Sequence, residues 1–210
     1  ASRGLGDVYK RQLKNSTELL SGDFNKGKVN RWAAMTLLSR VYLYKGEYNE
    51  ALTMAENAIK GAEKEGYALW TNEEYPTAWG NDASASNPGE ILFEIVNLTT
   101  DSPGKESMGY LNSYNGYDDM CITCSFYQLL KKDPKDVRLK ILSFDKKYYA
   151  YVNKYQPQQG ENITDANIPL IRLSEAYLNA AEAAVQTGDN AKAVKLSLIH
   201  ISEPTRRYAI

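Results

Sequence analysis

The sequence predicts a mainly α-helical fold, in which helical hairpins are joined by long loops and a few short β-strands. Two segments of the 210-residue chain carry apolar residues at three- and four-residue steps, which places them on one helical face. Between these segments the chain is rich in glycine, asparagine, serine and tyrosine, a composition typical of loops. Hydrophobic residues make up 43% and charged residues 24% of the chain, so a folded core is expected.

The first predicted hairpin covers residues 31–62. Gly46 ends its first helix, because glycine adopts the backbone conformation of a helix end without a steric clash. The apolar face of that helix consists of Ala34, Leu38, Val41 and Tyr42. The tetratricopeptide pattern that follows comprises Gly46, Tyr48, Ala51 and Ala58. The segment therefore reads as two helices that fold back on each other.

A second predicted hairpin lies near the C-terminus. Its first helix covers residues 171–183, its turn contains Gly188, and a second helix contains residues 191–194. One such hairpin cannot bury its apolar face alone, so the two hairpins are expected to pack side by side. The small residues expected at their contact are Ala51, Ala55, Ala180, Ala181 and Ala184. Arg172 and Glu175 are three residues apart on the predicted helix, and we expect them to form a helix-stabilising or an inter-helix pair.

The section between the hairpins predicts short elements separated by loops. Residues 77–89 and 99–119 read as loops, and residues 90–96 read as a buried strand because of their length and β-branched content. Residues 125–132 have the pattern of a short helix, and residues 140–155 that of a β-hairpin. Loops of about 15 residues are uncommon unless they carry function, which directs attention to residues 99–119.

Composition and motifs exclude several classes of function. The formal net charge is −1, so no nucleic-acid partner is expected. No apolar run approaches the roughly 20 residues of a membrane-spanning helix, and no signal sequence is present at the N-terminus. No catalytic motif, cofactor site or metal site is expected, and Asp118 and Asp119 are adjacent loop residues rather than a glycosidase acid pair.

Cys121 and Cys124 form the sequence's C-x-x-C motif. A redox pair or half of a zinc site is conceivable from this spacing. A tetrahedral zinc site would need two more ligands, and the chain has a single histidine, His200. Packed or half-exposed thiols are therefore the favoured interpretation.

Both ends of the chain resemble translated sequencing-adapter sequence. The resemblance lies in residues 4–12 and 196–207. We therefore expect residues 1–12 and 196–210 to be non-native tails and residues 13–195 to be a fragment of a single domain. The alternative is a native helix end and tail.

Three stretches resemble the SusD/RagB family. The first comprises residues 31–43, with the turn from Gly46 to Tyr48 and the helix that follows. The second is the strand at residues 90–95. The third combines Asp133-Pro134 with residues 168–183, and this last motif is the most specific. The resemblance covers about residues 32–195, in matching order and spacing.

The SusD/RagB resemblance implies an outer-membrane lipoprotein of Bacteroidota-like bacteria. Such a protein binds oligo- or polysaccharides at the cell surface and passes them to a TonB-dependent, SusC-like transporter for nutrient uptake, without catalysis. The lipid-bearing cysteine of the family is absent from this fragment, so membrane attachment would come through an anchor outside it. The alternative is a tetratricopeptide-like scaffold for protein–protein interaction, which the two hairpins alone would also support.

A glycan site is predicted in the aromatic loops. Sugars stack their C–H faces on aromatic rings and take hydrogen bonds from asparagine and aspartate, so exposed tyrosines among such residues suit a glycan. The expected binding residues are Trp70, Tyr110, Asn112, Tyr114, Asn115, Tyr117 and Asp118. The large residues expected in the core instead are Trp32, Tyr42, Leu69, Trp79 and Tyr177.

Overall fold

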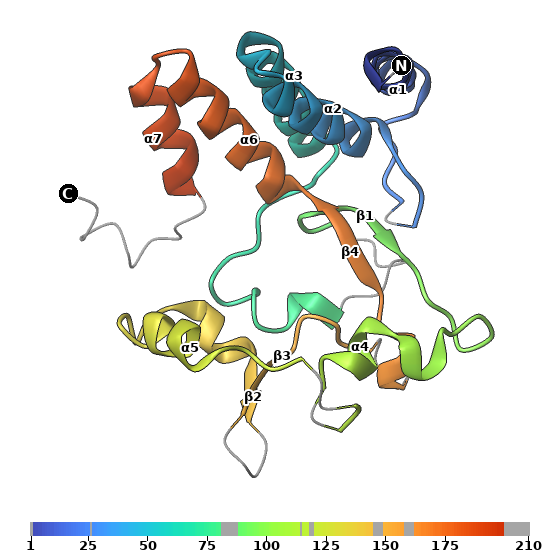
Figure 1. The fold of residues 1–210 in the computed structure, drawn as a ribbon, viewed down its shortest axis with the longest axis vertical. Coiled ribbons are helices and arrows are strands. Elements are labelled where there is room, and N and C mark those ends of the chain that lie inside the picture. Colours follow the sequence, from blue (N-terminus) through green and yellow to red (C-terminus); the bar gives the residue numbers. More distant parts are fainter. Residues whose placement is uncertain are drawn as a thin grey trace. The chain divides into compact units, whose positions relative to one another are not determined.

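Helices dominate the computed structural model (Figure 1), which describes residues 2–25, 27–80, 88–113, 115–117, 120–144, 149–157 and 162–199. The helices are α1 (Ser2–Leu19), α2 (Arg31–Lys45), α3 (Tyr48–Lys64), α4 (Met108–Leu111), α5 (Cys124–Leu130), α6 (Leu173–Gln186) and α7 (Asn190–Ile199). The strands are β1 (Ile91–Ile95), β2 (Leu142–Phe144), β3 (Ala150–Val152) and β4 (Ile168–Arg172). The short 3-10 turns of the described residues are η1 (Ala78–Gly80), η2 (Gly104–Glu106), η3 (Val137–Ile141) and η4 (Ile163–Asp165). The predicted mainly helical fold is confirmed.

The chain divides into two units, and each is built from segments that are separated in the sequence by parts of the other. We call the first the helical unit; it comprises Ala1–Leu69, Ser86–Glu94 and Pro169–Ile210. The second, the inserted unit, comprises Trp70–Ala85 and Ile95–Ile168. The pairing of β1 with β4 lies where the chain passes between the two units.

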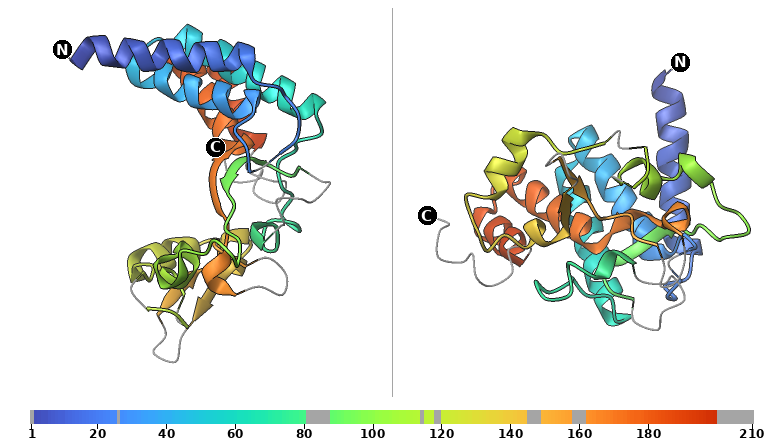
Figure 2. Two further views of the ribbon diagram at one scale, coloured as in Figure 1. Left: turned by 90° about the vertical axis from the view of Figure 1, so that its right-hand side faces the viewer. Right: turned by 90° about the horizontal axis from the view of Figure 1, so that it is seen from below.

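The predicted first hairpin is present as α2 and α3. Asn30 caps α2, because its side chain accepts a hydrogen bond from the Ala33 amide at 2.9 Å. Gly46 ends α2 with a φ of 74°, and its N–H donates to the carbonyl of Leu43. Alongside α2 runs α1 (Figure 2), and Lys10 of α1 pairs with Glu47 at 2.7 Å. Whether residues 1–12 are native stays a prediction.

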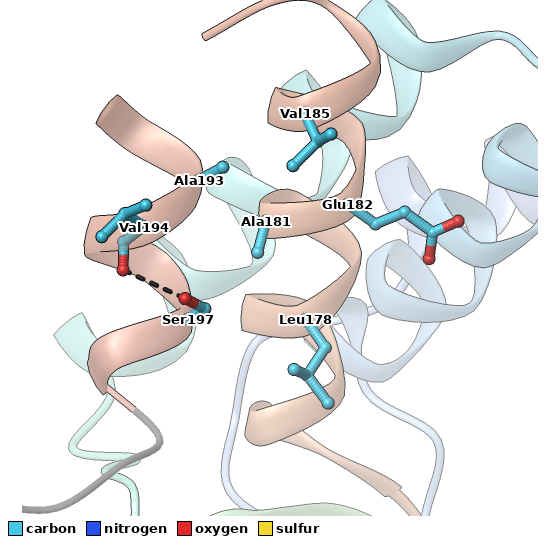
Figure 3. Close-up of a pocket in the computed structure, with 7 residues that line it drawn as sticks. All are labelled: Leu178, Ala181, Glu182, Val185, Ala193, Val194 and Ser197. Carbon is cyan, nitrogen blue, oxygen red and sulfur yellow. Dashed lines mark hydrogen bonds between the residues drawn. The ribbon is translucent and has the colours of Figure 1, made fainter. Parts of the chain in front are cut away.

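The two hairpins pack side by side, as expected, through α3 and α6. Ala55, Ala58 and Ala62 of α3 share a buried cluster with Ala176 and Ala180 of α6. A second cluster joins α2, α3 and α6, and it contains Leu38, Tyr42, Ala51 and Ala183. The prediction that Ala181 lies at the contact between the two hairpins was wrong. Figure 3 shows its side chain turned toward α7, because one residue step along a helix rotates the side chain by about 100°.

Trp32 of α2 fills a slot between two glycines. Its indole N–H donates to the carbonyl of Gly22 at 3.0 Å, and an added Cβ at Gly22 would lie 2.7 Å from the ring. On α3, an added Cβ at Gly61 would overlap the other end of the same ring. Trp32 packs against the core as predicted, although it is half-buried rather than fully buried.

A polar seam joins α2 to α6. The buried amide of Asn179 donates to the hydroxyl of Ser39 at 2.9 Å, and that hydroxyl donates to the carbonyl of Thr36 at 2.7 Å. Arg40 pairs with Glu175 through two hydrogen bonds of 2.5 and 2.6 Å. Arg172 and Glu175 do not pair with each other; Glu175 makes an inter-helix pair, the other form that was expected, and Arg172 has a partner elsewhere.

The partner of Arg172 is Glu90, because Arg172 lies on a strand rather than on the helix. β4 ends at Arg172 and α6 begins at Leu173, whose amide donates to the carbonyl of Glu90 at 2.7 Å. Glu90 is buried and also accepts a hydrogen bond from the Ser174 hydroxyl at 3.2 Å. The predicted strand at residues 90–96 is confirmed as β1. The expected helix start at residue 171 was two residues early.

In the inserted unit, β2 and β3 form the predicted hairpin. They pair antiparallel, with Leu142 opposite Val152 and Phe144 opposite Ala150. The predicted short helix at residues 125–132 is α5, which Thr123 caps by accepting the Phe126 amide at 3.3 Å. Leu130 of α5, Ile141 at the end of η3 and Tyr151 of β3 are buried.

Candidate functional site

The aromatic loop, by which we mean the segment after η2 that contains Tyr110 and Tyr117, is preceded by chain that is hydrogen-bonded to a buried polar group in η4. Asp165 is buried and accepts hydrogen bonds from the hydroxyls of Thr164 at 3.0 Å and Thr99 at 3.3 Å. The hydrogen bond from Ser102, together with these hydroxyls, lowers the pKa of the Asp165 carboxyl below its ordinary value and outweighs the opposing effect of burial. An ionised carboxylate therefore ties the chain before α4 to η4.

Beside this anchor, a second contact joins the same two segments. The Asn97 side chain donates to the Ala166 carbonyl at 2.6 Å, and the Asn97 backbone amide donates to the side chain of Asn167 at 3.0 Å. Both asparagines are buried. The chain that leads into the aromatic loop is thereby held at two positions, Asn97 and Thr99.

Helix α4 is seated tightly on this anchor. Ser107 caps it by accepting the Tyr110 amide at 3.1 Å. Gly109 faces η4 so closely that an added Cβ would overlap the Ile163 carbonyl oxygen. A larger residue would push α4 away, and the position of Tyr110 depends on this contact.

Tyr110 and Tyr117 lie together, as the predicted site requires. Their rings meet edge to face, with centroids 5.1 Å apart and planes at 87°. The Tyr117 amide donates to the Tyr110 carbonyl at 3.3 Å, and an added Cβ at Gly116 would overlap that carbonyl. Tyr110 is half-buried, whereas 45% of Tyr117 is exposed. One ring thus supports the other, which faces solvent.

The two asparagines of the loop differ in availability. Asn112 is half-buried, and its side-chain amide donates to the Met108 carbonyl at 2.9 Å, which leaves its oxygen as an acceptor. Asn115, two residues before Tyr117, is exposed. Tyr114 and Asp118, the other predicted binding residues of this loop, lie outside the described residues.

Trp70 belongs to a different aromatic group. Its ring lies 5.0 Å from that of Trp79 and 6.3 Å from that of Tyr75, and both contacts are edge to face. Trp79 is buried, as predicted, and the Lys154 ammonium lies 4.9 Å from its ring. Sequence reasoning missed Tyr75 as a neighbour of Trp70 and Lys154 as a neighbour of Trp79. The four-residue spacing of Tyr75 and Trp79 was the available signal.

The groove between α6 and α7 has a different character from the aromatic loop (Figure 3). It measures about 500 Å³ and is lined mainly by apolar side chains, among them Leu178, Val185 and Val194. Glu182 and Ser197 are its polar members, and the Ser197 hydroxyl already donates to the Val194 carbonyl at 3.1 Å. Such a lining offers few partners for the hydroxyls of a sugar.

The described residues contain no group of three or more His, Cys, Asp and Glu side chains that could hold a metal. Cys121 and Cys124 are both free and exposed, more so than the packed or half-exposed thiols expected. The reason is local, since Cys121 precedes α5 and Cys124 begins it. Among all the described residues, no helix combines the length and apolar character needed to cross a membrane.

Comparisons with known proteins place the chain. The SusD family model matches residues 145–199. A candidate sugar-binding protein from Bacteroides vulgatus ATCC 8482 is 93% identical, with a TM-score of 0.89, over 93% of this chain and 44% of that one. A SusD superfamily protein from Bacteroides thetaiotaomicron VPI-5482 is 33% identical, with a TM-score of 0.76, over 88% of this chain and 43% of that one. The chain belongs to the SusD/RagB family.

This SusD/RagB chain spans less than half the length of these two solved relatives. A laminarin-binding SusD-like protein shares the fold at 19% identity, with a TM-score of 0.70, over 95% of this chain and 53% of that one. A search of curated proteins finds no match. The resemblance inferred from residues 31–43, 90–95 and 168–183 is thus confirmed.

Proposed function

We propose that this SusD/RagB chain takes part in binding oligo- or polysaccharides, and that Tyr117, supported by Tyr110, supplies a stacking surface. The observation that carries this proposal is the exposed Tyr117 ring, which stands edge-on against Tyr110 in a loop anchored by Asp165. A ring held in place loses little conformational entropy when a sugar stacks on it. Asn115, two residues before Tyr117 in the sequence, is exposed and offers a hydrogen-bonding amide.

The same proposal includes a role without catalysis at the outer membrane. The bound glycan would be passed to a TonB-dependent, SusC-like transporter, and attachment to the membrane would come through a lipid anchor outside this segment. The support is family membership, together with a fold that a laminarin-binding protein shares. Trp70 takes a smaller part in this proposal than the sequence suggested, because its ring packs against Trp79 and Tyr75.

Calorimetry or affinity electrophoresis against a panel of neutral plant and host polysaccharides tests the proposal. Tyr117→Ala should weaken binding about fivefold, since a stacked ring contributes about 1 kcal/mol. Tyr44→Ala is the matched control, because Tyr44 is a highly exposed tyrosine on α2 in the helical unit. Its affinity should equal that of the unmodified chain.

Two results would count against the proposal. If a glycan binds and Tyr117→Ala retains full affinity, the stacking surface lies elsewhere. If the protein releases reducing sugar from a polysaccharide, the role is catalytic and the binding function is wrong. Gly116→Ala provides a check on the geometry, since its Cβ would displace the Tyr110 carbonyl and separate the two rings.

A further inference from the structure

The outward face of α5 is unusually apolar for so short a helix. The exposed fraction is 41% for Phe126 and 57% for Leu129, whereas Leu130, one turn after Phe126, is only 2% exposed. Phe144 of β2 adds a third large side chain, with 43% of its surface exposed. Several exposed apolar side chains within one short segment mark interaction sites more often than isolated ones do.

Tyr127 of α5 contacts Phe144 of β2. Its ring meets that of Phe144 edge to face, with centroids 5.4 Å apart, so that α5 and β2 are held together. The Lys131 ammonium lies 5.4 Å from the centre of the Tyr127 ring, within the range of a cation–π interaction. A positive charge therefore stands directly beside the aromatic contact.

The sequence around this contact is basic. Residues 131–154 contain eight Lys and Arg against three Asp, a net charge of +5 in a chain whose total is −1. Arg138 is neutralised by Asp136, which lies 2.5 Å away. Lys131, Lys132, Lys135 and Lys140 are exposed, and none of them has an ion-pair partner among the described residues. We call Phe126, Leu129, Phe144, Lys131 and Lys132 the α5 surface.

Helix electrostatics explain only part of this arrangement. Cations are favourable near a helix C-terminus, which accounts for Lys131 and Lys132 directly after Leu130. That effect gives no reason for large exposed side chains on the same helix and on β2. A ligand with both apolar faces and negative charges accounts for the two features together.

We infer that the α5 surface binds acidic polysaccharide, a glycan that carries carboxylate or sulfate groups. The C–H faces of its sugars pack on Phe126, Leu129 and Phe144, and its anions pair with the ammonium groups of Lys131 and Lys132. This inference rests on the proposed glycan-binding function but uses none of the residues of the Tyr110–Tyr117 loop. Rings beside cations also suit single-stranded nucleic acid, but the family and the chain's net charge of −1 favour the glycan.

The test compares polyanions with uncharged versions of the same polymer. Polygalacturonate is paired with its fully methyl-esterified form, and chondroitin sulfate with desulfated chondroitin, so that the carboxylate and the sulfate are tested separately. Affinity electrophoresis of the full chain should show retardation by at least one anionic polymer and weaker retardation by its uncharged version. Raising the salt concentration should weaken this binding, because exposed charges are screened.

Two double variants separate this surface from charge in general. Lys131→Gln with Lys132→Gln should lower the affinity for the bound anionic polymer roughly three- to tenfold, the effect of losing two exposed charge pairs. Lys60→Gln with Lys64→Gln removes two exposed lysines from α3 and should leave the affinity unchanged. Phe126→Ala should weaken binding in low and high salt alike, since its contribution is apolar. Circular dichroism confirms that each variant is folded.

Several outcomes overturn the inference. They are equal binding of the charged and uncharged polymers, an equal loss in the two lysine double variants, and tighter binding of a single-stranded DNA oligonucleotide than of either polyanion. If Tyr117→Ala abolishes acidic-glycan binding while the Lys131/Lys132 variant keeps it, the α5 surface is excluded and the proposed function stands. If no polysaccharide of either kind binds, both fail together.

Discussion

Replacing Gly61 with alanine tests how tightly α2 and α3 are packed. Alanine is the better helix former by about 1 kcal/mol, so the substitution would stabilise an uncrowded helix. At Gly61, however, the new methyl group overlaps the Trp32 ring, and Gly22 on the far side of the ring blocks its retreat. Overpacking of this kind costs about 1–3 kcal/mol, and the upper part of that range applies where the ring cannot move.

The expected net effect is a loss of about 1–2 kcal/mol. For a chain of this length the thermal midpoint should fall by roughly 3–6 °C, which far-ultraviolet circular dichroism can measure. Asn57→Ala, at an exposed position of the same helix, serves as control and should leave the midpoint unchanged or raise it slightly. In a Trp32→Leu background, Gly61→Ala should become neutral or stabilising, because the overlap is gone. An increase in midpoint for Gly61→Ala alone would refute the reasoning.

Three further measurements address other parts of the molecule. Ala180→Leu should cost about 1–3 kcal/mol of unfolding free energy, because Ala180 is buried against α3. Ala181→Leu should change it by less than about 0.5 kcal/mol, because Ala181 points into the groove toward α7. Equal losses would contradict the assigned faces. Asn179→Ala should cost about 1–2 kcal/mol in urea unfolding, since the Ser39 hydroxyl loses a buried donor. Asp165 has a lowered folded-state pKa, so its stabilising effect is complete above the unfolded-state pKa of about 4 and is lost as pH falls through the lower value. Asp165→Asn should therefore flatten the loss of stability in acid, and an unchanged acid limb would argue against the ionised anchor.

The helical hairpins could be predicted because their signals are local. The 3.6-residue period places Leu38 and Tyr42 on one face, and Gly46 and Gly188 adopt positive φ at the turns that the sequence marks. The direction of Ala181 could not be obtained in the same way. Its contacts depend on where α7 turns back, and several neighbouring alanines fit either face.

The partners of the charged residues were beyond local reasoning. Arg172 and Glu175 have helical spacing, but β4 continues through Arg172 and carries its side chain to Glu90, 82 residues away. Arg40 and Glu175 are 135 residues apart. For the candidate site, composition predicted that Tyr110 and Tyr117 would be exposed, whereas Tyr117 is exposed and Tyr110 is half-buried. Their edge-to-face contact depends on the close approach at Gly116, which no periodic pattern reports.

The strand pair β1–β4 has a consequence for how the chain can fold and vary. Hydrogen-bonded strands lie about 4.8 Å apart, so the pair holds both ends of the segment from Ile95 to Ile168 close together. Because loop-closure entropy grows only with the logarithm of length, lengthening that segment would cost the helical unit little. The α3–α6 contact, in contrast, cannot form until the whole segment has been synthesised. We therefore expect slow completion of the helical unit, and an insert that tolerates large changes in length and composition.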